Sequence, residues 1–162
     1  MKNIIGFNIT WFGLVYFGNN FIAVAIAFLL IHTLFFIQNP RELALLLSVS
    51  IIGIGVDTLL QHLAVFIFNQ SAFIPLWLMV LWPCFATTLS HSLRFLGKSI
   101  WFQYLAGLAA PLSYIAGHQL GVVNFGYSIT MTYCILAIIW CLLFMVFFQL
   151  QSALFNNEAY DD

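Results

Sequence analysis

The sequence carries very little charge. Only 6% of its 162 residues are Asp, Glu, Lys or Arg, whereas 64% are hydrophobic. A soluble domain of this size covers its surface with many more charged side chains, typically about a quarter of all residues. Four Lys and Arg residues are also too few to neutralise a nucleic acid backbone. The composition therefore excludes a soluble monomer, a nucleic-acid-binding protein and a disordered chain, and it indicates a multi-pass membrane protein.

Sequence motifs of known chemistry are also lacking. The chain has no CxxC, HExxH, GxSxG or P-loop motif. Its three cysteines lie in apolar stretches and its four histidines are dispersed along the chain. Neither a disulfide framework nor a metal site is expected from this pattern. We predict no metal and no cofactor. The sequence leaves open whether the protein is an enzyme, and it favours the answer that it is not.

The few charges divide the chain into three long apolar runs. One run lies before Arg41, one between Glu42 and Arg94, and one between Lys98 and Glu158. A membrane-spanning helix needs about 20 apolar residues, so each run is long enough for two helices and a turn. Turn-forming residues lie near the middle of each run, at 18–20, 69–71 and 121–126. The predicted spans are 4–17, 21–37, 43–68, 75–95, 100–120 and 127–151.

Four basic residues then fall on one side of the membrane: Lys2, Arg41, Arg94 and Lys98. The positive-inside rule places this side, and both termini, in the cytoplasm. We therefore predict an all-α membrane protein, a compact bundle of six transmembrane helices formed by residues 1–151. A short acidic cytoplasmic tail, residues 152–162, follows. An alternative with four helices takes residues 4–31 as a single span.

Asp57 is the first candidate for a functional site. It is the only ionisable carboxyl inside a predicted span, and such a group is expected to face the protein interior with a partner. At 1.5 Å per residue, Asp57 lies roughly 20 Å from the cytoplasmic end of its helix. Trp82 and Tyr114 fall near the same depth, so the three side chains can share one layer. Gly53, one turn before Asp57, permits close approach of another helix or a ligand.

A second cluster of polar side chains is expected nearer the cytoplasmic side. Thr87, Thr88 and His91 lie within one helical turn, and Thr87 and His91 are spaced to share a face. His32 is expected at a similar depth. A histidine titrates near neutrality, so this layer can pass protons or hold a polar head group. An ordinary hydrogen bond between helices is the alternative explanation. A direct bond between Asp57 and His91 is not expected.

Two prolines are predicted in the middle of spans. Pro83 and Pro111 cannot donate a hydrogen bond to the preceding turn, so each leaves a free carbonyl and a kink. Bent helices at the membrane midplane mark substrate sites in some transporters, although neighbouring helices often satisfy the free carbonyl instead.

Two stretches resemble a bacterial inner-membrane family known only as a domain of unknown function. Residues 75–93 (PLWLMVLWPCFATTLSHSL) are similar to its P-x-W-x3-L-W…F-A-T-x-L-x-H-S-L pattern. Residues 107–117 (GLAAPLSYIAG) are similar to its second motif, with Ala110 in place of the usual glycine. The resemblance spans nearly the whole chain and implies a location in the bacterial inner membrane. It implies no activity beyond a weak link to lipid or envelope-stress processes.

Three functions from different classes follow. The first is a small transporter or flippase of a lipid-like substrate, with a site formed by Asp57, Trp82, Tyr114, His91, Thr87 and Thr88. The second is a non-catalytic accessory protein that packs against a membrane protein partner in lipid or envelope-stress pathways. The third is a cofactor-free lipid enzyme with Asp57 or His91 as acid or base. In each case membrane lipids are the expected partners, and the oligomeric state is not predicted.

Overall fold

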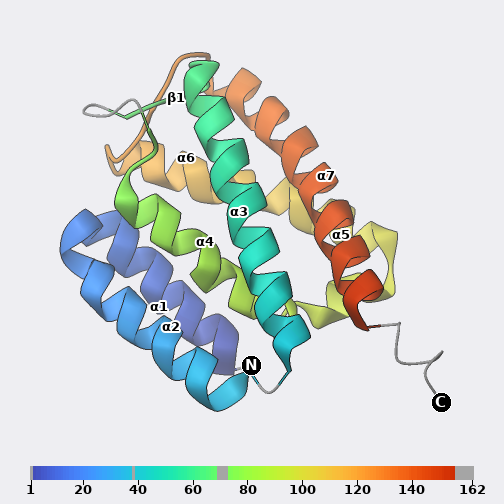
Figure 1. Ribbon diagram of the computed structural model, residues 1–162. Helices are drawn as coiled ribbons and strands as arrows, with labels where there is room; N and C mark the ends of the chain where they lie inside the picture. Colours follow the sequence, from blue (N-terminus) through green and yellow to red (C-terminus); the bar gives the residue numbers. More distant parts are fainter. Residues whose placement is uncertain (1, 38, 69–72, 156–162) are drawn as a thin grey trace.

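The structure is a bundle of helices (Figure 1). It is a computed structural model, and it describes residues 2–37, 39–68 and 73–155. The helices in chain order are α1 (Lys2–Phe17), the 3-10 helix η1 (Gly18–Phe21), α2 (Ile22–Phe36), α3 (Pro40–His62), α4 (Leu76–Leu89), the 3-10 helix η2 (Arg94–Lys98), α5 (Ile100–Ala109), α6 (Pro111–Gln119) and α7 (Ile129–Phe155). Two short strands, β1 (Phe66–Ile67) and β2 (Asn124–Phe125), pair antiparallel. The predicted turn at 69–71 and the end of the acidic tail, 156–162, lie outside the described residues.

Several helical segments have the length and composition of membrane spans. Among the described residues, three are long and apolar enough to cross a membrane: Ile4–Phe36, Pro40–His62 and Ile129–Phe155. Helix α4 is apolar but shorter. Large hydrophobic side chains cover the outside of the bundle, and Leu34, Phe35 and Ile51 each expose 70% or more of their surface. An apolar exterior of this kind is that of a membrane protein.

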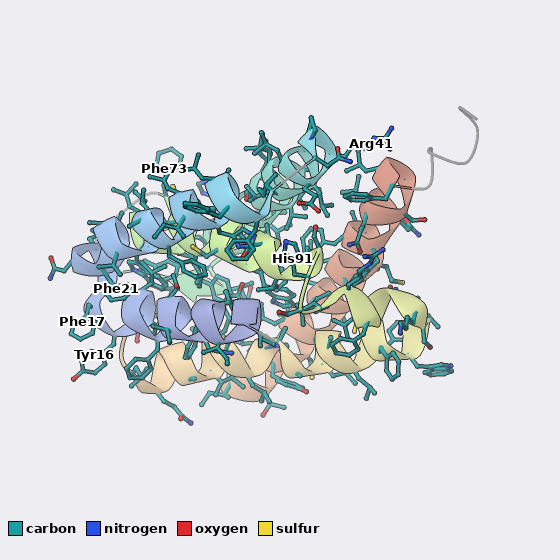
Figure 2. All side chains as sticks on the ribbon, turned by 90° about the horizontal axis from the view of Figure 1, so that it is seen from below. Tyr16, Phe17, Phe21, Arg41, Phe73 and His91 are labelled. Atoms are coloured by element: carbon teal, nitrogen blue, oxygen red, sulfur yellow. The ribbon has the colours of Figure 1, made fainter. Side chains whose placement is uncertain are left out.

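The first of these segments is folded back on itself. Gly18 adopts a φ of +56° at the start of η1, which allows the chain to turn between α1 and α2. A Cβ atom on Gly6 would overlap the ring of Phe28, and one on Gly13 would overlap the ring of Phe21. The two helices therefore lie side by side in antiparallel orientation. This arrangement disagrees with the alternative in which residues 4–31 form a single span. Figure 2 shows Phe21 close to the tip of this hairpin.

The helices run back and forth between two ends of the bundle. The Ile4 N–H donates to Ser92 Oγ (3.1 Å), and the Gln151 amide donates to the Leu89 carbonyl (3.4 Å), so the start of α1 and the end of α7 meet the end of α4. The paired strands β1 and β2 close the opposite end (Figure 1). The start of α3, which carries Arg41, and η2, which carries Arg94 and Lys98, also lie at the first end. The start of α1 and the end of α7 are therefore at the same end of the bundle.

Two predicted spans are too long. The third span was expected to reach residue 68, but α3 ends at His62 because Ala64 turns the chain with a φ of +55°. The fourth was expected to reach residue 95, but α4 ends at Leu89, and the Leu93 N–H closes on the Thr88 carbonyl (2.8 Å). Both segments are hydrophobic throughout, so the sequence pattern did not indicate these local turns. The strands β1 and β2 were not predicted either.

The two mid-span prolines behave differently. Pro83 lies inside α4, which continues through it. Pro111 is the first residue of α6, where its missing N–H costs little, and only Ala110 separates α5 from α6. The predicted fifth span is therefore two consecutive helices with a break at its centre.

Helix α4 joins two hydrophobic cores. Trp82 and Leu89 belong to the larger core, which α3, α4 and α7 share. Cys84 belongs to the smaller core, where it packs with Leu14 of α1 and Ala25 of α2. The α1–α2 hairpin therefore packs chiefly on α4, and a space between α1 and α6 becomes available for the site described next.

Candidate functional site

Asp57 of α3 is buried and holds two neighbouring helices. Only 1% of its surface is exposed. The Trp82 indole N–H of α4 donates to its Oδ2 atom at 2.8 Å. The Tyr114 hydroxyl of α6 donates to its Oδ1 atom at 3.1 Å. The depth estimate from the sequence placed these three side chains in one layer, and the structure brings them together.

Gly53 explains how the large Trp82 ring reaches Asp57. A Cβ atom at position 53 would overlap the six-membered part of this ring, whereas a Cβ atom at Gly55 would meet nothing within 4 Å. The glycine one turn before Asp57 therefore gives Trp82 its place, as the sequence suggested for close approach of another helix.

The rings of Phe66, Trp82, Tyr114 and Trp140 form an aromatic wall around Asp57. The Tyr114 ring stacks on Phe66 of β1, with centroids 5.0 Å apart and planes 6° apart. Trp82 stacks on Trp140 of α7 at 5.5 Å. The Trp140 ring also contacts the Tyr114 ring edge-on, with centroids 6.3 Å apart. The break at Pro111 starts a new helix three residues before Tyr114 and so sets the direction of this side chain.

A cavity of about 410 Å³ lies on the other side of the wall. Residues of α1, α4, α6 and α7 line it, and Phe, Trp and Tyr side chains dominate its surface. Trp82 and Tyr114 are among the lining residues, together with the polar Asn8 and Ser113. None of the described residues that line it is charged. Asp57 does not line the cavity, because the rings of Trp82 and Tyr114 stand between.

A protein-family comparison matches residues 1–146 to a family described as protein of unknown function, DUF2878. The chain belongs to this family. The match confirms the family resemblance drawn from the sequence and covers every element except the end of α7. Neither the curated proteins nor the solved structures contain a match to the chain.

The second predicted cluster of this DUF2878 protein is not part of the cavity wall. Thr87 and Thr88 are buried, and their hydroxyls donate to the carbonyls of Cys84 (2.8 Å) and Phe85 (2.6 Å) within α4. His91 lies beyond the end of α4, so the helical face that it was expected to share with Thr87 does not exist. It is exposed, and Figure 2 shows it beside α2. Its ring lies 5.3 Å from the ring of buried His32, in agreement with their similar predicted depth.

Several wall residues were not predicted as site residues. Ser113 and Trp140 both line the cavity. Ser113 follows Pro111 by two residues, so the proline at mid-span was the available signal. Trp140 was expected only to pack, and it does pack on Trp82. Within the described part of the chain no group of three or more His, Cys, Asp or Glu side chains is placed to hold a metal ion.

Proposed function

We propose that this protein is a small multi-pass transporter that binds a lipid-like molecule in the aromatic cavity. The observation that carries the proposal is the cavity itself. Its volume of about 410 Å³ falls within the usual range for small-molecule sites, about 300–1,000 Å³. Asn8, Ala109 and Leu112 of its wall are exposed, so it reaches the outside of the bundle between α1 and α6. An apolar molecule can therefore enter from the bilayer without crossing water.

The proposed membrane arrangement has six crossings in a bacterial inner membrane. Helices α1, α2, α3, α4 and α7 each cross once, and α5 with α6 forms the remaining crossing. The end that carries Arg41, Arg94 and Lys98 is cytoplasmic under the positive-inside rule. The test is a set of reporter fusions. A periplasm-dependent reporter should be active after Asn20 and after Gly121, and inactive after Phe155. Activity after Phe155 would reverse or break this topology.

The proposed role of Asp57 differs from that of a residue touching the substrate. Both of its oxygens accept hydrogen bonds from Trp82 and Tyr114, which face the cavity. Asp57 would act as a positioning residue that fixes the orientation of these two rings. In this proposal the substrate contacts the rings of Trp82 and Tyr114, and Asp57 lies behind them.

Photo-crosslinking tests whether the cavity is occupied. The protein, in native membrane vesicles, would be irradiated with a long-chain alcohol that carries a diazirine in its chain. Peptide mapping should find more label on the cavity residues of α1 and α6 than on Ile51 of α3. Ile51 is the reference because it faces outward, with 70% of its surface exposed. Ala116→Leu fills the cavity wall and should reduce this label. Ala27→Leu, on an exposed position of α2, is the matched control. Equal labelling of the two variants would refute the proposal.

The burial of Asp57 favours a second candidate, a non-catalytic accessory protein that binds a membrane protein partner. A sealed and fully bonded carboxyl needs no ligand to explain it. In that case Ala116→Leu leaves cell growth and partner binding unchanged, whereas changes on the exposed faces of α2 and α5 reduce the amount of partner recovered. A growth defect specific to Ala116→Leu would favour the transporter.

A further inference from the structure

The connection between α4 and α5 carries two exposed cationic side chains. Arg94 and Lys98 are the first and last residues of η2, and both are exposed. Leu96 lies between them and is buried in the larger core. A Cβ atom at Gly97 would lie 3.1 Å from the Phe148 ring of α7, so η2 also packs closely on that helix. The two cations therefore stand on a segment that is fixed to the bundle.

Acidic side chains that could balance these cations are scarce in this part of the chain. The sequence contains no Asp or Glu between Asp57 and Glu158. Asp57 is 1% exposed and lies in the bonded group of α3, α4 and α6. Neither Arg94 nor Lys98 forms an ion pair with another residue that the structure describes. The balancing anion therefore has to come from outside the described residues.

Exposed aromatic rings lie directly beside the two cations. In a 3-10 helix, residues three apart lie on the same side, so Phe95 and Lys98 are neighbours on the surface of η2. The Phe95 ring contacts the Phe102 ring of α5, with centroids 6.1 Å apart. The Trp101 and Tyr104 rings also contact each other at 6.1 Å, and all four rings are exposed. Aromatic side chains next to basic residues are typical of the boundary between lipid head groups and hydrocarbon.

An aliphatic surface continues from these rings along α5. Leu105 and Leu108 are exposed, and with Trp101 they have the spacing of one helical face. Trp101 and Leu108 are separated by roughly 10 Å of helix at 1.5 Å per residue. This length is most of the depth of one leaflet in a hydrocarbon core of about 30 Å. The surface thus presents cations, then aromatic rings, then aliphatic side chains, which is the order of the groups in one leaflet.

We infer that this η2–α5 surface, formed by Arg94, Phe95, Lys98, Trp101 and Leu105, binds an anionic phospholipid. The phosphate group of the lipid meets the two cations, and an acyl chain lies along α5. Hydrogen bonds from charged donors to a phosphate are stronger than those between neutral groups. A zwitterionic lipid brings a cation of its own, so it gains less from this pair. The inference goes beyond the proposed function and does not depend on what occupies the cavity, because these five residues do not line it.

The fluorescence of Trp101 tests the inference. Trp101 is 72% exposed, whereas Trp82 and Trp140 are buried. The protein would be reconstituted in phosphatidylcholine bilayers that contain a minor fraction of a brominated lipid, either phosphatidylglycerol or phosphatidylcholine with the same brominated chains. Bromine quenches an indole that it contacts, and comparison with Trp101→Phe isolates the emission of this residue. Quenching should indicate at least about fivefold enrichment of phosphatidylglycerol over phosphatidylcholine, the effect of one cationic side chain near the membrane surface. The enrichment should decrease as salt is raised.

Paired variants assign the preference to the two cations. Arg94→Gln combined with Lys98→Gln should make quenching by the two lipids equal. Arg94→Lys combined with Lys98→Arg keeps both charges and should retain the preference. Arg41→Gln is the matched control, because it removes a cation from the start of α3 at the same end of the bundle. It should leave the preference at Trp101 in place.

Two results would overturn the inference. One is equal quenching by the two brominated lipids in the unmodified protein. The other is a preference for phosphatidylglycerol that survives the double glutamine variant. Quenching by brominated phosphatidylcholine shows in every variant that Trp101 still faces lipid, so a misfolded variant is recognised. Neither result bears on labelling of the cavity, and failure of this inference is therefore distinct from failure of the proposed function.

Discussion

The Trp82 indole of α4 donates its N–H to the Asp57 carboxyl of α3 at 2.8 Å, and both side chains are buried. The bond depends on close packing, because Gly53 lies directly beneath the ring. Tyr114 of α6 completes the group from a third helix. The carboxyl therefore connects three helices, and the face of the group that is turned away from Asp57 forms part of the cavity wall.

Gly53→Ala should destabilise the protein. The added methyl group would overlap the Trp82 ring, which cannot shift without losing its bond to Asp57. Overpacking of this kind costs about 1–3 kcal/mol. Gly55→Ala is the matched control, since it lies on the same helix in open space and should be neutral or slightly stabilising. The measurement is the midpoint of thermal unfolding in detergent. Equal midpoints for the two variants would show that Trp82 does not pack on Gly53.

Asp57→Asn should weaken the group without dismantling it. Asparagine has only one acceptor oxygen, so it cannot keep the Trp82 bond on one oxygen and the 3.1 Å Tyr114 bond on the other. The expected loss is about 0.6–1.7 kcal/mol in unfolding free energy. Thr58→Val is the neighbouring control, because the Thr58 hydroxyl donates only within α3, to the Ile54 carbonyl. A loss for Thr58→Val as large as that for Asp57→Asn would remove the special role of the carboxyl.

Part of the fold was predictable from the position of charges. A helical chain with segments long and apolar enough to cross a membrane follows from the long runs of few charges before Arg41, between Glu42 and Arg94, and after Lys98. What could not be predicted depends on local conformation. Ala64 adopts a left-handed φ that ends α3 early, and a residue other than glycine gives no warning of such a turn.

The site was predictable in part. Depth arithmetic brought Asp57, Trp82 and Tyr114 to one layer, because the rise of a helix per residue is regular. It could not show that the two rings would cover the carboxyl, since the rotation of each helix about its axis is set by packing. The cavity depends on the same packing, on the break at Pro111 and on the position of the α1–α2 hairpin, none of which the apolar pattern specifies.

A double-mutant cycle should reveal coupling through Asp57. Trp82→Phe removes the indole donor to Oδ2, and Tyr114→Phe removes the hydroxyl that lies 3.1 Å from Oδ1 and 3.4 Å from Oδ2. Once one bond is lost the carboxyl can reorient toward the remaining donor, so the two losses should not add. We expect an interaction free energy of about 0.5–1 kcal/mol, obtained from unfolding of the single and double variants. In an Asp57→Ala background the same cycle should give additive losses. Coupling that persists in the Asp57→Ala background would instead arise through Trp140, whose ring contacts both Trp82 and Tyr114.

Gly107→Ala should disrupt the contact between α5 and α7. A Cβ atom at position 107 would lie 2.7 Å from the Cα and N atoms of Cys141, and backbone atoms cannot move aside as a flexible side chain can. Separating two packed helices should cost about 1–3 kcal/mol in unfolding free energy, more than the small gain in helix propensity from alanine. Gly117→Ala is the control on α6, where the new Cβ atom would make an ordinary contact of 3.6 Å with Val123. The measurement is the unfolding midpoint in detergent, followed by gel filtration to check that the variant stays monodisperse. If Gly107→Ala is as stable as Gly117→Ala, the backbones of α5 and α7 are not in close contact at Gly107 and Cys141.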